Sequence, residues 1–421
     1  MSMKLRLKGN KKISINEKTN EFIRPDYVYI PLISHGNKNC EMLVNIGDTV
    51  KKGTVIALRE SDKFPILSSI SGVVENVVDM VYINGEMVST VVIKNDFKEK
   101  TFRVNTLNDD ISKISKEEFI DRLMKNGVSG LSGNDFSAYI KYSTEDKLNI
   151  LVVNGVECEP FITADYAVMK NHTEEILETV DAIMSIMGLE RAVISFKDEF
   201  KELKVAFDSI SGTYPNIDIM TVRDYYPAGW ERNLISDVLH LKYKTRPSEV
   251  GVVVSNVSTI FEIYQVLKYN KPLTEKYITI TGDAIKEPQN ILVKIGSKIS
   301  DVISTIGGYN EEENVVVLTG GPMMGKSISS LQTVVVKPLN GIIVSKYIKE
   351  KATECMRCGK CVEACPVNLS PVSIAKSLKN KKELKKLKCD KCIHCGLCSY
   401  VCPAKIDVRE KVEAGISEVL K

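Results

Sequence analysis

The chain has 421 residues, of which 43% are hydrophobic and 26% charged, and its formal net charge is +3. This length is enough for several domains with buried cores, the composition is that of a globular protein, and the small net charge gives no reason to expect nucleic-acid binding. No stretch approaches the ~20 apolar residues of a membrane span, and the basic segment Met1–Gly9 lacks the apolar core of a secretory signal. We therefore expect a cytoplasmic protein that reaches a membrane only through a partner.

Residues 27–98 predict short β-strands separated by Gly, Asp and Lys turns. The run from Val44 to Ala57, followed by Pro65–Glu75, resembles the barrel-sandwich hybrid fold of biotinyl and lipoyl carrier domains. Those carriers present a lysine in a hairpin turn for attachment, and we expect the corresponding stretch, Lys63–Ser68, to offer no such hairpin lysine. We therefore assign residues 1–99 a structural or docking role rather than that of a swinging arm.

Residues 100–272 predict an α/β core. Ser115 and Glu118 have the spacing of a capping box at the start of a helix. An apolar strand, Leu148–Asn154, is followed by alternating helix and strand patterns at a spacing typical of a largely parallel sheet. The predicted elements are helix Thr173–Met187, strand Arg191–Phe196, strand Ile217–Val222, helix Glu231–His240 and strand Gly251–Ser255.

Residues 273–345 show a sequence pattern different from that of the α/β core. Two half-buried strands, Tyr277–Gly282 and Ile291–Gly296, precede a short helix, Ile299–Ile306, and this order resembles a β-grasp module of the SLBB type. The strand Val315–Leu318 then enters the glycine loop Thr319–Gly325. The simplest interpretation of that loop is a tight turn at a domain face.

Residues 346–421 carry nine of the 11 cysteines, in two runs of the form C-x2-C-x2-C-x3-C-P plus Cys389. This clustering argues against a secreted disulfide scaffold. In two-cluster ferredoxins the fourth cysteine of each run binds the other [4Fe–4S] cluster. We therefore assign one cluster to Cys355, Cys358, Cys361 and Cys402, and the other to Cys392, Cys395, Cys398 and Cys365. Structural zinc is the weaker alternative, because two complete runs are far more specific than a single C-x2-C.

Lysines crowd the segment between the two runs. They form either a docking face for an acidic ferredoxin or flavodoxin or a solvated helix face, and the sequence favours neither. We interpret Cys389 as a bystander thiol rather than a redox-sensitive or ligand-swapping one. The chain has no nucleophile–His–acid arrangement and no Walker A loop, so the sequence offers no residues for hydrolase or NTPase chemistry, and we assign no catalytic residue. The lysines are Lys376, Lys379, Lys381, Lys382, Lys385, Lys386, Lys388 and Lys391.

Five stretches, in this order, resemble the C subunit of Rnf-type electron-transport complexes and its relatives, which include the electron-transfer subunit associated with proline reductase. They are Asn154–Asp165, Tyr226–Glu231, Gly251–Thr259, Gly320–Gly325 and Cys355–Cys361. The resemblance covers nearly the whole chain. It implies that the α/β core is similar to the flavin-binding subunit of respiratory complex I, which binds FMN and meets NADH.

A flavin site needs glycines for close backbone approach to a phosphate and polar groups to fix the ring edge. Three carboxylates follow the strand Leu148–Asn154, where a site opens in a parallel sheet, although a solvated turn is the alternative. The resemblance implies that the flavin and nicotinamide site contains Asn154, Glu157, Glu159 and Asp165, with Asn256 and Thr259 in a flavin-contacting stretch. The glycine loop would contribute Gly127, Gly130 and Gly133.

This glycine loop departs from the family pattern, Gly-Gly-x-Gly-Phe-Pro-Thr. Here Ser132, Asp135 and Ser137 replace two glycines and the proline, and a carboxylate facing phosphate opposes binding. The N-terminal region also lacks the Gly-Gly-x-His-Pro-Pro opening usual in Rnf C subunits. Both departures argue against NADH binding and weaken the case for FMN.

We therefore predict a protein that relays electrons through two [4Fe–4S] clusters to or from a partner: an Rnf-like complex, a ferredoxin, a flavodoxin, or a reductase such as proline reductase. The alternative is the FMN-containing, NADH-oxidising subunit of an ion-translocating NADH:ferredoxin oxidoreductase. A third hypothesis is a scaffold that keeps the clusters but has lost its flavin site. The expected location is cytoplasmic, peripheral at the inner face of the cell membrane.

Overall fold

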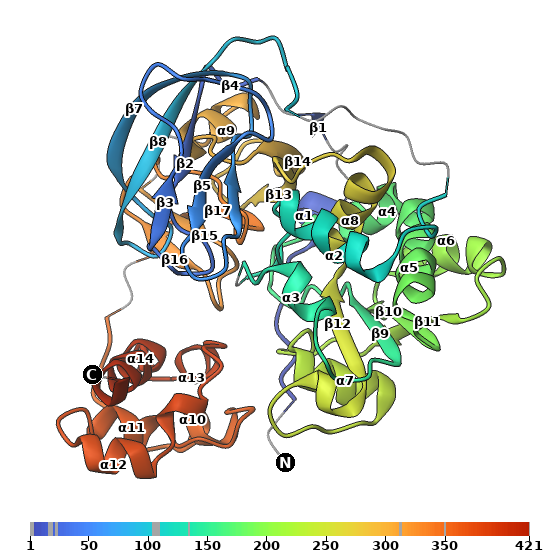
Figure 1. Cartoon of the computed structure of the whole chain (residues 1–421). Coiled ribbons are helices and arrows are strands. Elements are labelled where there is room, and N and C mark those ends of the chain that lie inside the picture. Colours follow the sequence, from blue (N-terminus) through green and yellow to red (C-terminus); the bar gives the residue numbers. More distant parts are fainter. Residues whose placement is uncertain are drawn as a thin grey trace.

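The computed structural model describes residues 4–15, 20–21, 24–102, 110–133, 135–310, 314–348 and 351–420. In Figure 1 the early strands and the strands of residues 275–346 pack together, the α/β core lies beside them, and the C-terminal helices form a separate lobe. None of the helices in these described ranges has the length and apolar character needed to span a membrane.

The N-terminal barrel consists of two antiparallel sheets around one apolar core. The first sheet has the order β2-β8-β7-β4 and the second β3-β5-β6. Alternating Val and Ile residues, such as Val28, Ile30, Val91 and Ile93, point inward and are at most 2% exposed. The strands are β2 (Tyr27–Pro31), β3 (Cys40–Met42), β4 (Thr49–Val50), β5 (Val55–Arg59), β6 (Pro65–Leu67), β7 (Gly72–Val81) and β8 (Met87–Asn95).

The prediction that the barrel lacks a hairpin lysine was wrong. Lys63 lies in the turn between β5 and β6 with φ +58°, and its ammonium lies 2.9 Å from the Glu41 carboxylate. The same turn docks on the α/β core, because Arg59 donates to Ser137 Oγ at 2.8 Å and Tyr139 donates to Asp62 at 2.6 Å. These contacts agree with a docking role for the hairpin.

The α/β core is built on a parallel sheet with the order β11-β10-β9-β12. Successive side chains along its strands alternate between two buried faces. One face packs against α2, α5, α6 and α8, and the other against α7.

The start of α2 and the end of α5 agree with the sequence prediction. The Ser115 side chain accepts from Glu118 N at 3.1 Å, and Gly188 ends α5 with φ +64°. The strands are β9 (Ile150–Asn154), β10 (Arg191–Lys197), β11 (Ile217–Val222) and β12 (Val252–Asn256). The helices are α2 (Lys116–Lys125), α3 (Ala138–Tyr142), α4 (Ala164–Asn171), α5 (Thr173–Met187), α6 (Lys201–Ser211), α7 (Glu231–Leu239), the 3₁₀ turn η1 (Pro247–Val250) and α8 (Val257–Tyr269).

A six-stranded mixed sheet with the order β1-β14-β13-β17-β15-β16 forms the β-grasp module, and α9 contributes to its core. Its elements are β13 (Glu275–Thr281), β14 (Gln289–Lys294), α9 (Ile299–Thr305), β15 (Val315–Thr319), β16 (Lys326–Ile328) and β17 (Gly341–Lys346). The edge strand β1 (Asn20–Glu21) comes from the N-terminal region, which also carries helix α1 (Lys12–Ile15). Residues 4–15 therefore lie against the core and this module, outside the barrel: Leu5 bridges to Tyr226, and Ser14 contacts Thr163.

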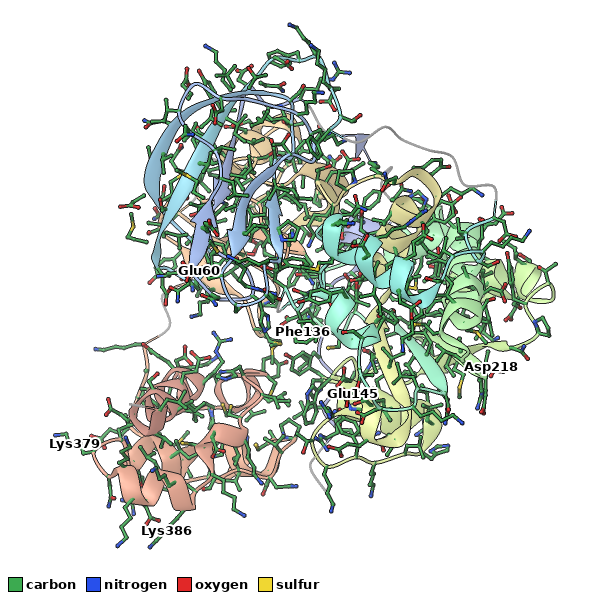
Figure 2. The ribbon with its side chains drawn as sticks, viewed as in Figure 1. Glu60, Phe136, Glu145, Asp218, Lys379 and Lys386 are labelled. Carbon is green, nitrogen blue, oxygen red and sulfur yellow. The ribbon has the colours of Figure 1, made fainter. Side chains whose placement is uncertain are left out.

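The C-terminal lobe is a set of short helices around a core that contains several of the cysteines. Cys389 is fully buried in that core beside Ile374 and Leu384, so its place is that of a packed small residue. The elements are α10 (Lys360–Glu363), α11 (Pro371–Lys376), α12 (Lys381–Lys386), η2 (Cys389–Lys391), α13 (Leu397–Tyr400) and α14 (Val408–Leu420). Figure 2 shows Lys379 and Lys386 on the side of this lobe that faces away from the rest of the molecule.

Candidate functional site

A cavity of about 800 Å³ opens at the carboxyl ends of β9 and β12. This is the position at which parallel sheets place their ligand sites. Every major part of the chain contributes to the wall: the barrel through His35 and Tyr82, the glycine loop before α3, the core, the β-grasp module through residues 319–326, and the C-terminal lobe through Ile393 and Cys395. Of the residues predicted for the flavin site, those lining the cavity are Gly130, Gly133, Asn154, Glu157, Glu159, Asp165, Asn256 and Thr259.

Asn154, Asp165 and Asn256 form one hydrogen-bonded network in the cavity wall. Asn256 caps α8 by accepting from Ser258 N at 3.0 Å, and its amide donates to Asp165 Oδ2 at 2.8 Å and to Asn154 O at 3.3 Å. Ser258 Oγ donates to the other Asp165 oxygen at 2.6 Å. Burial raises the pKa of Asp165, and these two donors oppose that rise. The network fixes the ends of β9 and β12 relative to each other.

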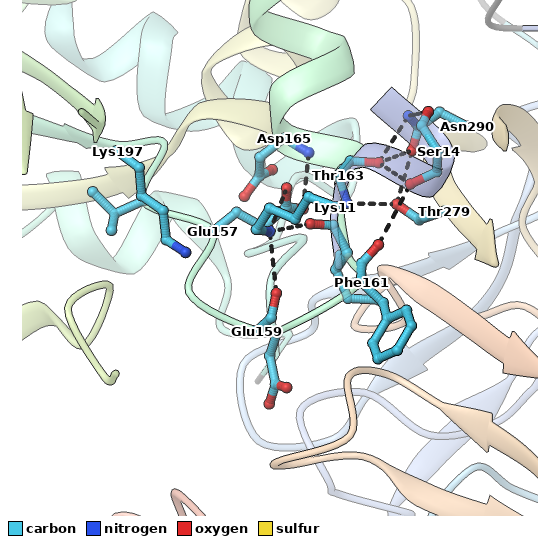
Figure 3. A network of polar contacts seen from close by, with 12 residues as sticks. Lys11, Ser14, Glu157, Glu159, Phe161, Thr163, Asp165, Lys197, Thr279 and Asn290 are labelled. Atoms are coloured by element: carbon cyan, nitrogen blue, oxygen red, sulfur yellow. Dashed lines mark hydrogen bonds and ion pairs between the residues drawn. The ribbon is translucent and has the colours of Figure 1, made fainter. Parts of the chain in front are cut away.

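Glu157 lies beside the buried lysine Lys11 (Figure 3). Its Oε1 accepts from Asp165 N at 3.1 Å. Its Oε2 accepts no hydrogen bond within the part of the chain that the structure describes, and lies 3.8 Å from Lys11 Nζ. Burial raises the pKa of Glu157 to about 7, against the attraction of Lys11. This oxygen is itself shielded from solvent, and its partner is the Lys11 ammonium, with which it forms a buried ion pair.

Lys11 was not predicted from the sequence, because nothing near it marks a site. It lies at the start of α1, only 4% exposed, and its ammonium donates to the carbonyl oxygens of Glu159 (3.1 Å) and Ile162. Burial lowers the pKa of this lysine, and the Glu157 carboxylate opposes the change. The N-terminal segment thus holds the backbone of the acidic loop that follows β9.

Glu159 has a different environment from the one predicted. Both of its carboxylate oxygens are used within the chain: Oε2 accepts from Met323 N at 3.0 Å and Oε1 from Met324 N at 2.8 Å. Burial raises the pKa of Glu159 to about 7 despite these two donors. The carboxylate joins the core to the glycine loop of the β-grasp module, although the residue still borders the cavity.

The glycine loop before α3 also differs in detail from the prediction. Gly127 lies outside the cavity wall, where Lys337 donates to its carbonyl at 2.9 Å, whereas Ser132 and Gly133 are exposed at the cavity. Asn134 lies outside the described residues. A Cβ added at Gly133 would meet nothing within 4 Å, so this position tolerates close approach by a ligand.

Asp135, whose carboxylate was expected to oppose a bound phosphate, does border the cavity, but its carboxylate is held by groups of the barrel and of its own loop. Asp135 is 6% exposed and accepts from His35 N at 2.9 Å, from Ser34 Oγ at 3.4 Å and from Ser129 Oγ. The carboxylate thus ties the glycine loop to the barrel. Its charge is still opposed to a phosphate nearby, but three donors within the chain already bind its two oxygens.

Other residues of the cavity wall could be identified only from the fold. Trp230, which is the single tryptophan, and Tyr226 lie in the stretch Tyr226–Glu231, which carried the family resemblance without a role for either residue. Tyr226 donates through its hydroxyl to Cys395 O at 2.8 Å. Lys141 donates to Val254 O at 2.8 Å at another point of the wall.

The four cysteines assigned to the second cluster surround a small cavity in the C-terminal lobe. Cys365, Cys392, Cys395 and Cys398 all line it. Two backbone amides already point at sulfur, Leu369 N toward Cys365 Sγ at 3.3 Å and His394 N toward Cys392 Sγ at 3.4 Å. Such N–H···S contacts are one of the means by which proteins tune cluster potentials. The residues present therefore fit a [4Fe–4S] cluster at this position.

The cysteines assigned to the first cluster lie nearer the surface. Cys355 and Cys358 are exposed and Cys361 is half-buried. Thr353 N donates to Ala404 O at 2.9 Å, which brings the start of the first run beside the segment that carries Cys402. Among the described residues no group of three or more His, Cys, Asp or Glu side chains forms a site for a single metal ion.

Comparison with family models gives four matches along the chain. They are the RnfC barrel-sandwich hybrid domain at residues 4–98, the Nuo51 FMN-binding domain at residues 123–265, the SLBB domain at residues 277–327 and the 4Fe-4S dicluster domain at residues 354–406. The fold class predicted from the sequence is confirmed. Fold and cysteine sites together define an iron–sulfur electron-transfer protein with two [4Fe–4S] clusters and an FMN-type core.

Similar proteins show to which family of iron–sulfur electron-transfer proteins the chain belongs. The C subunit of the proton-translocating ferredoxin:NAD(+) oxidoreductase complex of Clostridium ljungdahlii is 33% identical over 82% of this chain and 77% of that protein. The C subunit of the Na(+)-translocating ferredoxin:NAD(+) oxidoreductase complex of Acetobacterium woodii is 32% identical over 84% of this chain and 81% of that protein. The chain belongs to the family of Rnf complex C subunits.

Among solved structures, a chain of an NAD+-reducing [NiFe]-hydrogenase in the H2-reduced state shares the fold, with a TM-score of 0.51 and 14% identity. The match covers 74% of this chain and 61% of that chain, so it spans about three fifths of the hydrogenase chain.

Proposed function

We propose that this protein passes electrons between FMN bound in the large cavity, the two [4Fe–4S] clusters and a partner of an Rnf-like complex. The observation that carries the proposal is the position of Cys395, a cysteine assigned to the second cluster, in the wall of the cavity. FMN, when bound, supplies the exchange between two-electron and one-electron chemistry. The clusters carry single electrons away from it or toward it.

The cavity supports FMN in three respects. Its volume of about 800 Å³ lies within the ~300–1,000 Å³ range of ligand pockets. Gly130 and Gly133 leave backbone exposed along one wall, and the polar residues Asn154 and Glu157 lie in another. The family match to the Nuo51 FMN-binding domain covers the same part of the chain.

The positions of the two cluster sites define the two ends of the proposed electron path. The second site borders the cavity through Cys395, and the first site is exposed through Cys355 and Cys358. An exposed cluster is the natural point of exchange with another protein. Residues 351–421 carry 15 Lys and Arg against 8 Asp and Glu, which favours an acidic partner such as a ferredoxin or flavodoxin.

The relatives act in membrane complexes that are named for ferredoxin and NAD(+). By analogy, NADH is the proposed reductant at the FMN end, and peripheral attachment to an ion-translocating complex at the inner face of the membrane is the proposed location. The occupied carboxylate of Asp135 removes part of the objection to NADH.

The test is an anaerobic purification assayed for iron, sulfide and FMN, followed by an NADH titration monitored by EPR. We expect about eight irons per chain, bound FMN that quenches Trp230 fluorescence, and cluster signals that appear with NADH. Eight irons with no flavin bound and no response to NADH would contradict the proposal. Zinc in place of iron would contradict the cluster assignment.

A second candidate is a relay without flavin that receives electrons from a protein donor and passes them to a dedicated reductase such as proline reductase. The observation in its favour is the glycine loop, where Ser132 and Asp135 replace residues that allow close approach to phosphate. The two candidates differ in one measurable respect. A flavin-free relay would keep all its iron and be reduced by a protein donor, but not by NADH with added FMN.

A further inference from the structure

The loop Gly320–Gly325 connects the cavity to the second cluster site. It follows β15 and turns back into β16, closed by a hydrogen bond from Gly325 N to Gly321 O at 2.8 Å. On one side it receives the Glu159 carboxylate at Met323 N and Met324 N. A Cβ at Gly321 would lie 2.1 Å from Glu159 Oε2, so the carboxylate approaches only because this residue is glycine.

The other side of the loop faces the C-terminal lobe. Arg409, on α14, donates from its two terminal nitrogens to Met323 O at 2.8 Å and to Gly325 O at 3.4 Å. Gly396, the residue after Cys395, packs so closely that a Cβ there would lie 2.3 Å from Met323 O. The Met323 side chain is 6% exposed and packs in one apolar cluster with Cys395 and Leu397.

These contacts form a continuous connection. The chain of contacts runs from Glu159 through the Met323–Met324 amides to Arg409 and to the turn at Cys395 and Gly396. A second, shorter connection is the Tyr226 hydroxyl on Cys395 O. Near Cys395, the described contacts to the rest of the molecule thus come largely from two anchors, and Glu159 supports the larger one.

We propose that Glu159 and Arg409 are positioning residues that clamp the Cys395 turn against the cavity through the Gly320–Gly325 loop, and so set the rate of electron exchange between cavity and second cluster. Glu159 acts from the cavity side and Arg409 from the lobe side. Neither residue needs to touch a cofactor for this role. The inference rests on the proposed function only in that FMN occupies the cavity.

The first test needs no flavin. Hydrogen exchange of the protein with both clusters is compared for wild type, Glu159→Gln, Arg409→Met, Arg409→Lys and the control Lys386→Met, whose lysine is exposed on α12 and pairs with Glu383 on the same helix. We expect Glu159→Gln and Arg409→Met to speed exchange at residues 321–325 and 393–397 at least about tenfold, because each one removes donors or acceptors of this loop. Arg409→Lys restores part of the protection, and Lys386→Met matches wild type. Unchanged exchange in the first two variants would overturn the inference.

The second test measures the electron step in protein that retains FMN and both clusters. Bound FMN is photoreduced in a flash, and the appearance of the reduced second cluster is followed in time. Electron transfer slows steeply as the distance between donor and acceptor grows, so we expect Arg409→Met to slow the step several-fold with unchanged iron and FMN. Because Arg409 also borders the second cluster site, the cluster potential of each variant is measured and the rates are compared at equal driving force. Equal rates in wild type and Arg409→Met would overturn the clamp. A wild-type protein without bound FMN would instead overturn the proposed function and leave the exchange experiment to decide the clamp.

Discussion

The two cluster sites in the C-terminal lobe have opposite surroundings. At the inner site, Cys365 and Cys395 are 7% and 9% exposed, and Cys395 reaches the cavity wall. At the outer site, Cys355 and Cys358 are exposed in a segment that is exposed from residue 351 to residue 358. Under the proposed function, the inner site is placed for electron exchange within the protein and the outer site for exchange with a partner.

Replacing a cysteine at each site is expected to give the largest effects. Cys395→Ser and Cys355→Ser should each lose about four of eight irons. Cys395→Ser should also abolish reduction of the remaining cluster from the cavity, whereas Cys355→Ser should leave the inner cluster reducible. Iron analysis and EPR after reduction measure both effects. If FMN still reduced the outer cluster of Cys395→Ser at the wild-type rate, the inner and outer assignment would be wrong.

Lys11, buried beside the cavity, and Lys376, near the exposed cluster site, should differ strongly in their contribution to the free energy of unfolding. Lys11→Met leaves two carbonyl oxygens and the Glu157 carboxylate without their buried partner, and removing one partner of such a pair costs about 3 kcal/mol or more of the free energy of unfolding. Lys376→Met, exposed beside Cys355, should cost less than about 0.5 kcal/mol. Urea denaturation followed by Trp230 fluorescence compares them. Similar midpoints for the two variants would refute the structural role of Lys11.

The pH dependence of the free energy of unfolding should also reveal the buried Glu157 at the cavity. Burial raises the pKa of Glu157 to about 7, so between its ordinary pKa of about 4.3 and 7 the folded state binds more protons than the unfolded state. Stability from this group is therefore present at low pH and is lost as pH rises toward 7, by about 3 kcal/mol between pH 5 and 8. Glu157→Gln should flatten the dependence of the unfolding free energy between pH 5 and 8 by that amount. Glu159, with a pKa also raised to about 7, leaves a residual decline in this variant. A variant with the full wild-type slope would contradict the assignment to Glu157.

Among the substitutions at the cavity wall, Tyr226→Phe is expected to have a small effect. It removes only the hydrogen bond from the hydroxyl to Cys395 O, which is worth about 1 kcal/mol. We expect a slightly lower denaturation midpoint and cluster content close to wild type. Phe136→Leu, at a cavity position whose ring packs edge-on against His35, provides a comparison at a distance from the clusters. A loss of the inner cluster in Tyr226→Phe would show that the Gly320–Gly325 loop alone cannot hold the Cys395 turn.

Local patterns predicted the elements well because their physical basis is local. The N-cap at Ser115, the alternating Val and Ile residues of the barrel and the strand β9 all follow from hydrogen bonds and side-chain periodicity within a few residues. The hairpin lysine was missed because strand register decides which residue reaches a turn. Lys63 enters the β5–β6 turn through pairing that leaves Glu60–Lys63 at its tip.

By itself, the sequence predicted the cluster chemistry, the order of the fold units and eight of the residues that line the cavity. Cysteine spacing and strand periodicity are properties of short segments, so they can be recognised without knowledge of the fold. Tertiary structure alone decided which groups each carboxylate contacts. Glu157 keeps a buried oxygen without a hydrogen-bond donor among the described residues. Glu159 accepts hydrogen bonds from backbone amides 164 residues away along the chain, and Asp135 from a backbone amide 100 residues away. Only the fold could bring Lys11 and Arg409 to this site, because hydrogen bonds between distant segments depend on how the whole chain packs.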